Sequence, residues 1–351
     1  MKKIETQNRI ICENPNSMFN YFGWPSVNRL PDGTLAMVCS GFRMSHVCPF
    51  GKSVICYSRD EGKTWTKPAV VIDTPEDDRD SGIVTFGGKV MLNTFNCGFT
   101  TPTYEEEKLS YFYQLPVSLG YMSQVDREAA DKCYAGSLYA ISDDGYEFGP
   151  IQRCPVQTPH GGCVLPDGRI FFVGRHYGAD GQFSSALHCY IYDNENNWSY
   201  VSEIPCPENE PYYCEPHVIA LEDRIVVHIR SYNFMILQCE SYDGGKTFTK
   251  PRVLVTHGSP PHLLRHSSGV LICSYGYRLE PFGQRFMLSY DNGETWETDY
   301  VLRDDGHDGD LGYPCTVELN DGSLLTVYYQ KPAGLDNTVI MQSIWRLPER
   351  K

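Results

Sequence analysis

The sequence lacks the features that mark membrane proteins and nucleic-acid-binding proteins. No apolar run approaches the roughly eighteen residues of a transmembrane helix, and Met1–Arg9 contains no apolar segment typical of a secretory signal. Positive charge is scarce, because 44 Asp and Glu residues outnumber 30 Lys and Arg residues and give a net charge of −14. A phosphate-binding surface needs an excess of Lys and Arg. We therefore expect no nucleic-acid and no membrane partner, and a neutral or small substrate.

The cysteine pattern gives no sign of a metal cluster. The fourteen cysteines contain no C-x-x-C pair, and many lie in apolar runs such as Val38-Cys39 and Ile272-Cys273. Because no secretory signal is visible, we expect reduced, buried thiols that pack as small hydrophobic groups in a cytoplasmic protein. We predict no metal and no cofactor.

Helical periodicity is nearly absent, and a polar turn closed by an aromatic residue recurs instead. Its copies are Ser58–Trp65, Ser241–Phe248 and Ser289–Trp296, with weaker ones at Ser142–Phe148 and Tyr192–Trp198. In each turn the Asp accepts hydrogen bonds, the Gly takes a positive φ, the Thr begins the next strand and the aromatic packs on a neighbour. The aspartates at 144, 193, 243 and 291 lie 49, 50 and 48 residues apart. This period predicts a radial array of small sheets.

Six hairpin turns alternate with these repeats, and each is followed by a β-rich run. The turns are Pro31–Gly33, Phe86–Gly88, Pro166–Gly168, Glu222–Asp223, Ser267–Gly269 and Asn320–Gly322. Asp-Gly between apolar runs is a strong hairpin signal. Six turns predict an all-β fold, a six-bladed β-propeller that forms one domain over residues 1–351. We expect the tail Gln342–Lys351 to close the ring against the N-terminal strand.

One segment interrupts the repeats, an insertion at about residues 98–132. Its stretches Tyr104–Lys108 and Val125–Lys132 indicate a helical turn or two. Long insertions in compact folds usually serve a function. Two interpretations stay open, a lid over a substrate site or an interface through which the protein forms an oligomer.

The residues that start the innermost strand of each blade are expected to line one pocket on the propeller axis. Counting back about eight residues from each hairpin turn gives these starts. They are Trp24-Pro25, Arg79-Asp80, Pro159-His160, Glu215-Pro216, Pro260-Pro261 and Tyr313-Pro314. An apolar core would not place an aromatic, acidic or imidazole side chain beside a proline in this way. Glu215 and Tyr313 are then expected to face one another across the pocket.

In these features the chain resembles the sialidase (neuraminidase) superfamily, six-bladed propellers whose recurring turns are called Asp boxes. The resemblance covers nearly the whole chain, although Asp boxes also occur in carbohydrate-binding and glycan-lyase propellers. It depends most on Cys214-Glu215-Pro216-His217, on Arg230 fifteen residues after Glu215, and on Gly312-Tyr313 at the start of the last blade. Arg285 precedes the Asp box at Ser289 and matches the place of a substrate-binding arginine.

The resemblance implies a retaining glycosidase in which Tyr313 is the nucleophile and Glu215 is its general base. A phenol with a pKa of about 10 is a poor nucleophile until a carboxylate takes its proton. Tyrosine is a known exception to the two-carboxylate rule for glycosidases. Arg230 and Arg285 would hold a substrate carboxylate through charge-assisted hydrogen bonds. Arg278 competes with Arg285 for this role.

Two departures from the family pattern concern the sugar-binding half of the site. The family's first carboxylate-binding arginine is replaced, because Trp24 stands in its place. The acid/base aspartate is expected between a pocket arginine, here Arg43, and the first Asp box, but residues 41–57 contain no Asp or Glu.

The proton donor must therefore come from elsewhere. The candidates are His46, Asp80 and His160, of which we favour Asp80 or His46. We predict an exo-acting glycoside hydrolase that releases a terminal acidic sugar, not necessarily ordinary sialic acid, from a glycan or other small sugar substrate.

Other interpretations stay open. The same scaffold suits a glycan lyase or a non-sialic glycosidase that uses Tyr313 with a histidine, or a non-catalytic glycan-binding propeller. Glu215 and Arg230 can instead form a purely structural ion pair. Arg43 and Arg175 can be solvated charges at the rim of the pocket.

Overall fold

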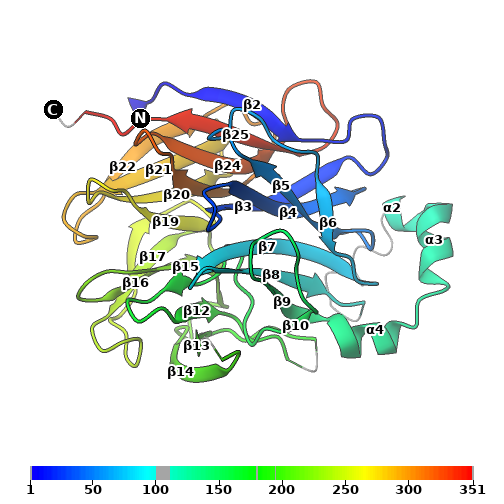
Figure 1. Cartoon of the computed structure of the whole chain (residues 1–351), viewed down its shortest axis with the longest axis horizontal. Coiled ribbons are helices and arrows are strands. Elements are labelled where there is room, and N and C mark those ends of the chain that lie inside the picture. Colours follow the sequence, from blue (N-terminus) through cyan, green and yellow to red (C-terminus); the bar gives the residue numbers. More distant parts are fainter. Residues whose placement is uncertain (1, 100–110, 179–180, 194, 350–351) are drawn as a thin grey trace.

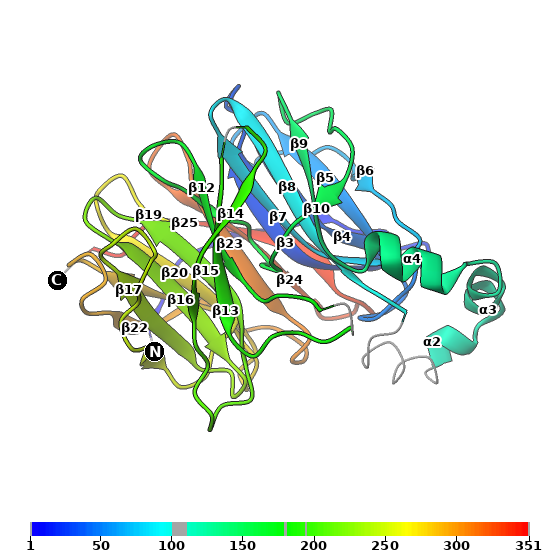
Figure 2. The same cartoon turned by 90° about the horizontal axis from the view of Figure 1, so that it is seen from below.

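Six mainly antiparallel sheets surround a central axis in the computed structural model, which describes residues 2–99, 111–178, 181–193 and 195–349 (Figures 1 and 2). Each sheet forms one blade, in which the first strand lies beside the axis. The predicted all-β, six-bladed propeller is confirmed. Because the blades follow one another in chain order, residues at equivalent places in different blades meet at the axis.

Each blade contains four strands that follow one another in the sequence, except that the last strand of the sixth blade comes from the N-terminus and that β1 adds a fifth strand to the fifth blade. The first three blades contain β3 (Tyr21–Arg29), β4 (Leu35–Arg43), β5 (Lys52–Ser58) and β6 (Ala69–Ile72); β7 (Asp77–Phe86), β8 (Lys89–Cys97), β9 (Gly136–Ser142) and β10 (Gln152–Arg153); and β11 (Cys163–Val164), β12 (Ile170–Gly174), β13 (Leu187–Tyr192) and β14 (Trp198–Ile204). The last three contain β15 (Tyr213–Ala220), β16 (Ile225–Ser231), β17 (Ile236–Ser241) and β18 (Arg252–Val255); β19 (Pro261–Arg265), β20 (Leu271–Tyr277), β21 (Gly283–Ser289) and β22 (Glu297–Arg303); and β23 (Gly312–Glu318), β24 (Leu324–Gln330) and β25 (Val339–Trp345).

The two ends of the chain close the ring. β2 (Gln7–Cys12) completes the sixth blade by pairing antiparallel with β25, and β1 (Lys2–Lys3) pairs in parallel with β22 of the fifth blade. Trp345 donates from Nε1 to Oγ1 of Thr326 at 2.9 Å, and its ring lies 4.4 Å from that of Phe286 in the fifth blade. The predicted closure of the C-terminal tail on the N-terminal strand is confirmed.

The two kinds of turn alternate as predicted. All six hairpin turns join the first and second strands of a blade, and the Asp boxes join third and fourth strands. In the first box, Asp60 accepts hydrogen bonds from the backbone N–H and the hydroxyl of Thr64 at 2.8 and 2.6 Å, and Ser58 Oγ accepts from Gly62 N at 2.9 Å. The prediction that this Thr begins the next strand is wrong. Its side chain completes the turn, and β6 begins only at Ala69.

Two buried glutamines fasten Asp boxes to a neighbouring blade. Trp296 Nε1 donates to Gln238 Oε1 at 2.7 Å, and Gln238 Nε2 donates to the carbonyl of Gly293 in the same box at 2.9 Å. Trp65 donates to Gln342 in the same way at 2.7 Å, from the first blade to the sixth. Each of these boxes therefore stabilises the contact between two blades, because the indole N–H of its tryptophan is satisfied by a side chain of the neighbouring blade.

The inner strands contain bulges at the places where the sequence predicts pocket residues. Trp24, Glu215 and Tyr313 have positive φ angles of 54°, 44° and 49°, and each precedes a proline. The pairing register of β3, β15 and β23 shifts at these positions. A non-glycine residue in this conformation costs about 1–3 kcal/mol and is typical of functional sites, where a bulge can re-aim a side chain.

The insertion contains three short helices, which stand out from the side of the ring (Figures 1 and 2). They are α2 (Tyr111–Gln114), α3 (Pro116–Met122) and α4 (Arg127–Tyr134). The helix predicted at Val125–Lys132 is confirmed as α4, whereas Tyr104–Lys108 lies outside the described residues. No helix in the described part of the chain is long and apolar enough to cross a membrane.

The helices are held against the first two blades by aromatic contacts. The hydroxyl of Tyr121 on α3 donates to the carbonyl of Pro75, and its ring lies 5.0 Å from that of Phe50. All fourteen cysteines lie in the described part of the chain, and eleven of them are buried, as the sequence predicts.

Candidate active site

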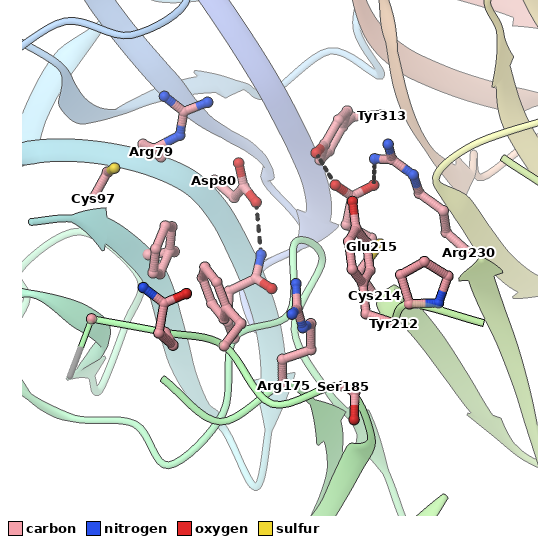
Figure 3. Close-up of a pocket in the computed structure, with 16 residues that line it drawn as sticks. Arg79, Asp80, Cys97, Arg175, Ser185, Tyr212, Cys214, Glu215, Arg230 and Tyr313 are labelled. Carbon is pink, nitrogen blue, oxygen red and sulfur yellow. Dashed lines mark hydrogen bonds and ion pairs between the residues drawn. The ribbon is translucent and has the colours of Figure 1, made fainter. Parts of the chain in front are cut away.

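A pocket of about 560 Å³ is lined by residues of the second, third, fourth and sixth blades (Figure 3). Its charged lining consists of three arginines and two acids. They are Arg79, Arg175, Arg230, Asp80 and Glu215. A chain with a net charge of −14 thus concentrates guanidinium groups at this place, which suits an anionic ligand.

Tyr313 and Glu215 are hydrogen-bonded to one another in this pocket. The Tyr313 hydroxyl donates to Glu215 Oε1 at 2.8 Å, and Arg230 Nη1 donates to Oε2 of the same carboxylate at 2.6 Å. Figure 3 shows both side chains pointing toward Glu215. The three residues come from the fourth and sixth blades, so the propeller itself brings them together.

The two partners have shifted pKa values that fit a base and a nucleophile. Burial raises the pKa of the Tyr313 phenol well above its ordinary value, and the charges of Glu215 and Asp80 add to the rise. Burial also acts to raise the pKa of Glu215, but Arg230, Arg278 and the Tyr313 hydroxyl together hold it below its ordinary value. At neutral pH a neutral phenol therefore faces an ionised carboxylate that can take its proton.

Asp80 places a second carboxyl in the pocket, on the side away from Arg230 (Figure 3). Gln157 Nε2 donates to Asp80 Oδ2 at 3.0 Å. Burial outweighs the opposing charge of Arg79 and raises the pKa of Asp80 to about 6. A carboxyl with this pKa can donate a proton and take one back close to neutral pH.

Arg278 and Arg285, which the sequence could not separate, have different surroundings. Arg278 is not among the residues that line the pocket, but its charge acts on both Glu215 and Tyr313, and its Nε donates to the carbonyl of Leu311 at 3.0 Å. Arg285 is 3% exposed, and its guanidinium donates only to backbone carbonyls, among them that of Pro281 at 2.8 Å. Arg285 is not among the residues that line the pocket, and its two Nη atoms donate to carbonyls outside it.

Arg43 and Trp24 also lie behind the pocket wall. Arg43 is fully buried and forms a two-point ion pair with Asp77, at 2.6 and 3.0 Å. Trp24 is 2% exposed, and the guanidinium groups of Arg43 and Arg79 lie 4.8 and 4.3 Å from its ring. Neither residue can reach a substrate, and Arg43 is not a solvated rim charge. Both support the wall that carries Arg79.

The two candidate histidines differ in how far their side chains are exposed to solvent. His46 is half exposed, and its Nδ1 lies 3.1 Å from Asp310 Oδ1 and 2.9 Å from the Tyr21 hydroxyl. His160 is 3% exposed, and burial together with the charge of His217 holds its pKa well below the ordinary value. A buried imidazole that stays neutral is a poor proton donor, so the structure does not support His160 in this role.

Arg175 is the pocket residue that the sequence analysis interpreted differently, as a solvated rim charge. It follows β12 directly, and an arginine ends or follows the second strand in three other blades. These are Arg43, Arg230 and Arg278. Only Arg175 and Arg230 lie at the same distance from their hairpin turns, seven residues after Gly168 and Asp223, and this shared spacing is the signal in the sequence that could have placed them together.

The described helices of the insertion do not line this pocket. Both interpretations of the insertion, lid and oligomer interface, stay predictions.

Comparisons with known proteins agree with this architecture. The profile of the BNR repeat-like domain matches residues 108–326. A crystal structure of a protein of unknown function from Dyadobacter fermentans is 23% identical, with a TM-score of 0.79, and the alignment covers 98% of this chain and 99% of that one. No curated protein sequence matches the chain.

Sialidases share the same fold at lower identity. Trypanosoma rangeli sialidase in complex with sialic acid is 13% identical, with a TM-score of 0.67 over 98% of this chain, which spans only 59% of the length of that protein. A Hadza microbial sialidase is 16% identical, with a TM-score of 0.63, and the alignment covers 93% of this chain and 66% of that one. At these identities the likeness concerns the fold. The chain belongs to the BNR repeat-like family, and it shares its propeller fold with the sialidases.

Proposed function

We propose that the protein is a retaining exo-glycoside hydrolase that releases a terminal acidic sugar, with Tyr313 as nucleophile and Glu215 as its general base. The observation that carries the proposal is the 2.8 Å hydrogen bond from the Tyr313 hydroxyl to the Glu215 carboxylate inside an arginine-rich pocket. A neutral phenol approaches the anomeric carbon of an anionic sugar with less charge repulsion than a carboxylate nucleophile does.

The first half of the reaction forms a covalent sugar–enzyme bond. Tyr313 Oη attacks the anomeric carbon while Glu215 takes the phenol proton, and the bond from that carbon to the leaving oxygen breaks. Asp80 gives its proton to the leaving oxygen. In the second half, the Asp80 carboxylate takes a proton from water, which attacks the anomeric carbon. Tyr313 leaves and recovers its proton from Glu215, so two inversions retain the configuration.

Substrate binding itself helps to activate the base. Arg230 holds the Glu215 carboxylate at 2.6 Å and lowers its pKa, which weakens it as a base in the empty site. A substrate carboxylate that binds Arg230 and Arg278 neutralises these charges. The pKa of Glu215 then rises, and the carboxylate accepts the Tyr313 proton more readily.

We propose Asp80 as the proton donor. It lines the pocket beside the Tyr313–Glu215 pair and has a pKa of about 6. His46 is not part of the pocket lining, and its imidazole is hydrogen-bonded to Asp310. The pH profiles of Asp80 and His46 variants distinguish the two donors.

One observation favours a second candidate, a non-catalytic glycan-binding propeller. The ion pair between Arg230 and Glu215, two largely buried side chains, is what a purely structural pair requires. In that case Tyr313 serves as a hydrogen-bond donor to a bound sugar and no bond is broken.

The deciding experiment follows a panel of aryl glycosides of acidic sugars, including sialic acid and uronic acids, by nuclear magnetic resonance. Release of the free sugar first as the retained anomer supports the proposal, and release as the inverted anomer contradicts it. An unsaturated, ultraviolet-absorbing product identifies a lyase. Binding by calorimetry without product from any member of the panel identifies the binding protein.

A further inference from the structure

Arg175 lines the same pocket as Tyr313 but takes no part in the reaction described above. It follows β12 of the third blade, where its backbone N–H and carbonyl pair with Gln157 at 3.1 and 2.8 Å. Gly174 allows this pairing, because a Cβ at that position would lie 2.2 Å from the carbonyl oxygen of Gln157. The backbone that carries Arg175 is thus tied to the residue that holds Asp80.

The guanidinium of Arg175 is fixed between two aromatic rings. Its Cζ lies 4.6 Å from the ring centre of Phe183 and 4.6 Å from that of Tyr212, and its Nε donates to the carbonyl of Ser184 at 2.7 Å. The aromatic contacts hold the plane of the group, and the single backbone contact engages Nε only. Figure 3 shows the group pointing toward the space that Asp80 and Glu215 also face.

No acid neutralises this guanidinium within ion-pair distance in the described part of the chain. The other two arginines of the lining do have acidic partners, Asp77 for Arg79 and Glu215 for Arg230. Burial lowers the pKa of Arg175, because no close acidic partner offsets the cost of removing its charge from water. The charge of Glu215 in the same pocket acts on Arg175, but no described carboxylate lies within ion-pair distance of it, and a guanidinium fixed in this way can bind an anion from outside the protein.

We propose that Arg175 forms a second anion subsite, which binds a sulfate ester or a second carboxylate of the substrate while Arg230 and Arg278 bind the first acidic group. The inference deepens the proposed function and rests on it, and it identifies the substrate class as a doubly anionic sugar or a disaccharide of two acidic sugars.

The two anion positions lie within reach of one ligand. Arg175 and Arg230 line the same pocket together with Tyr212, whose ring centre lies 4.6 Å from the Arg175 guanidinium, and the charges of both arginines act on the Tyr212 phenol against the rise in pKa that burial causes. A pocket of about 560 Å³ is within the usual range for small-molecule sites.

The test measures binding by calorimetry in the Tyr313→Phe background, in which turnover cannot disturb the titration. The probes are glucuronic acid and sialic acid, a sulfated form of each, and a disaccharide of two uronic acids. We expect at least one doubly anionic probe to bind about tenfold or more tightly than its singly charged counterpart. A preference for the sulfated forms identifies a sulfate subsite, and a preference for the di-uronate identifies a carboxylate subsite.

Three variants complete the test. Arg175→Gln is expected to abolish the preference for doubly anionic probes and to leave affinity for the singly charged probes within about twofold. Arg175→Lys is expected to keep part of this preference, because a point charge remains. Arg169→Gln, which removes an exposed arginine of the same blade that is paired with Asp167, is expected to change nothing.

Equal binding of singly and doubly charged probes overturns the inference. An equal loss of affinity for all probes in Arg175→Gln also overturns it, because the residue is then structural. If Arg175→Gln does not fold, the comparison of probes on the parent protein and on Arg175→Lys still decides. The inference fails on binding alone, whereas the proposed function fails on the absence of hydrolysis.

Discussion

The hydroxyl of Tyr313 donates a 2.8 Å hydrogen bond to Glu215, although 98 residues separate the two in the sequence. Both residues adopt a left-handed backbone conformation at a bulge in the first strand of their blade, and both precede a proline. The contact is therefore a product of the ring and of two repeated local distortions.

Replacing the proposed base should reduce catalysis with little effect on the fold. We expect Glu215→Gln to lower kcat by about 10²–10⁴-fold, because an amide cannot take the phenol proton while it can still accept its hydrogen bond. Steady-state kinetics on the best aryl glycoside measure this change. Glu222→Gln, an exposed residue of the same blade, serves as the control and should keep the parental rate. A parental rate in Glu215→Gln would exclude the residue as base.

Activity should depend on pH through Asp80. Because the donor must be protonated and burial raises its pKa to about 6, kcat/KM should fall as the pH rises through about 6. In Asp80→Asn this fall of kcat/KM at higher pH, the alkaline limb of the pH profile, should disappear for substrates with good leaving groups, which need no proton. Substrates with poor leaving groups should hardly react with this variant. If the limb persists in Asp80→Asn and disappears in His46→Gln, His46 is the donor.

The glutamines that fasten the Asp boxes should contribute to stability and not to catalysis. Gln238→Ala leaves the indole N–H of Trp296 without its partner, whereas the carbonyl of Gly293 still accepts from Arg252 at 2.8 Å. We expect a loss of about 1–3 kcal/mol in the free energy of unfolding, measured by urea denaturation, with unchanged kcat. Gln124→Ala, at an exposed position, is the matched control. A normal unfolding midpoint would show that the bond is dispensable.

The buried ion pair behind the pocket should make stability depend on pH in the acidic range. Burial opposes ionisation of Asp77, but Arg43 and Arg79 hold its pKa below the ordinary carboxyl value of about 3.9. The contribution of ionised Asp77 to the free energy of unfolding is therefore present above the pKa of this carboxyl in the unfolded state. It is lost as the pH falls through the lower pKa of the folded state.

Asp77→Asn should destabilise the protein by about 3–5 kcal/mol at neutral pH, because Arg43 stays buried with no charged partner of its own. The difference between the two proteins in urea unfolding should shrink as the pH is lowered. A difference that stays constant down to strongly acidic pH would contradict the assigned pKa direction.

The fold was predictable because its signals are local. Asp-Gly turns and Asp boxes specify their own conformation within a few residues, and their spacing gives the blade count. Glu215 and Tyr313 were identified because they start inner strands, and Arg230 joined them through the resemblance to the sialidase superfamily. The sequence could not predict that Arg43 and Arg285 lie outside the pocket, because their partners, Asp77 and backbone carbonyls, become neighbours only in the folded chain. The cytoplasmic location and the oligomeric state stay predictions.

The most direct test of the account compares the wild-type protein with Tyr313→Phe on the aryl glycoside that the wild type hydrolyses fastest. Tyr242→Phe, an exposed Asp-box tyrosine, is the matched control. We predict that Tyr313→Phe loses at least about 10³-fold in kcat while it still binds the released sugar, because only the attacking oxygen is removed. Equal rates in wild type and Tyr313→Phe would contradict the assignment of Tyr313 as nucleophile.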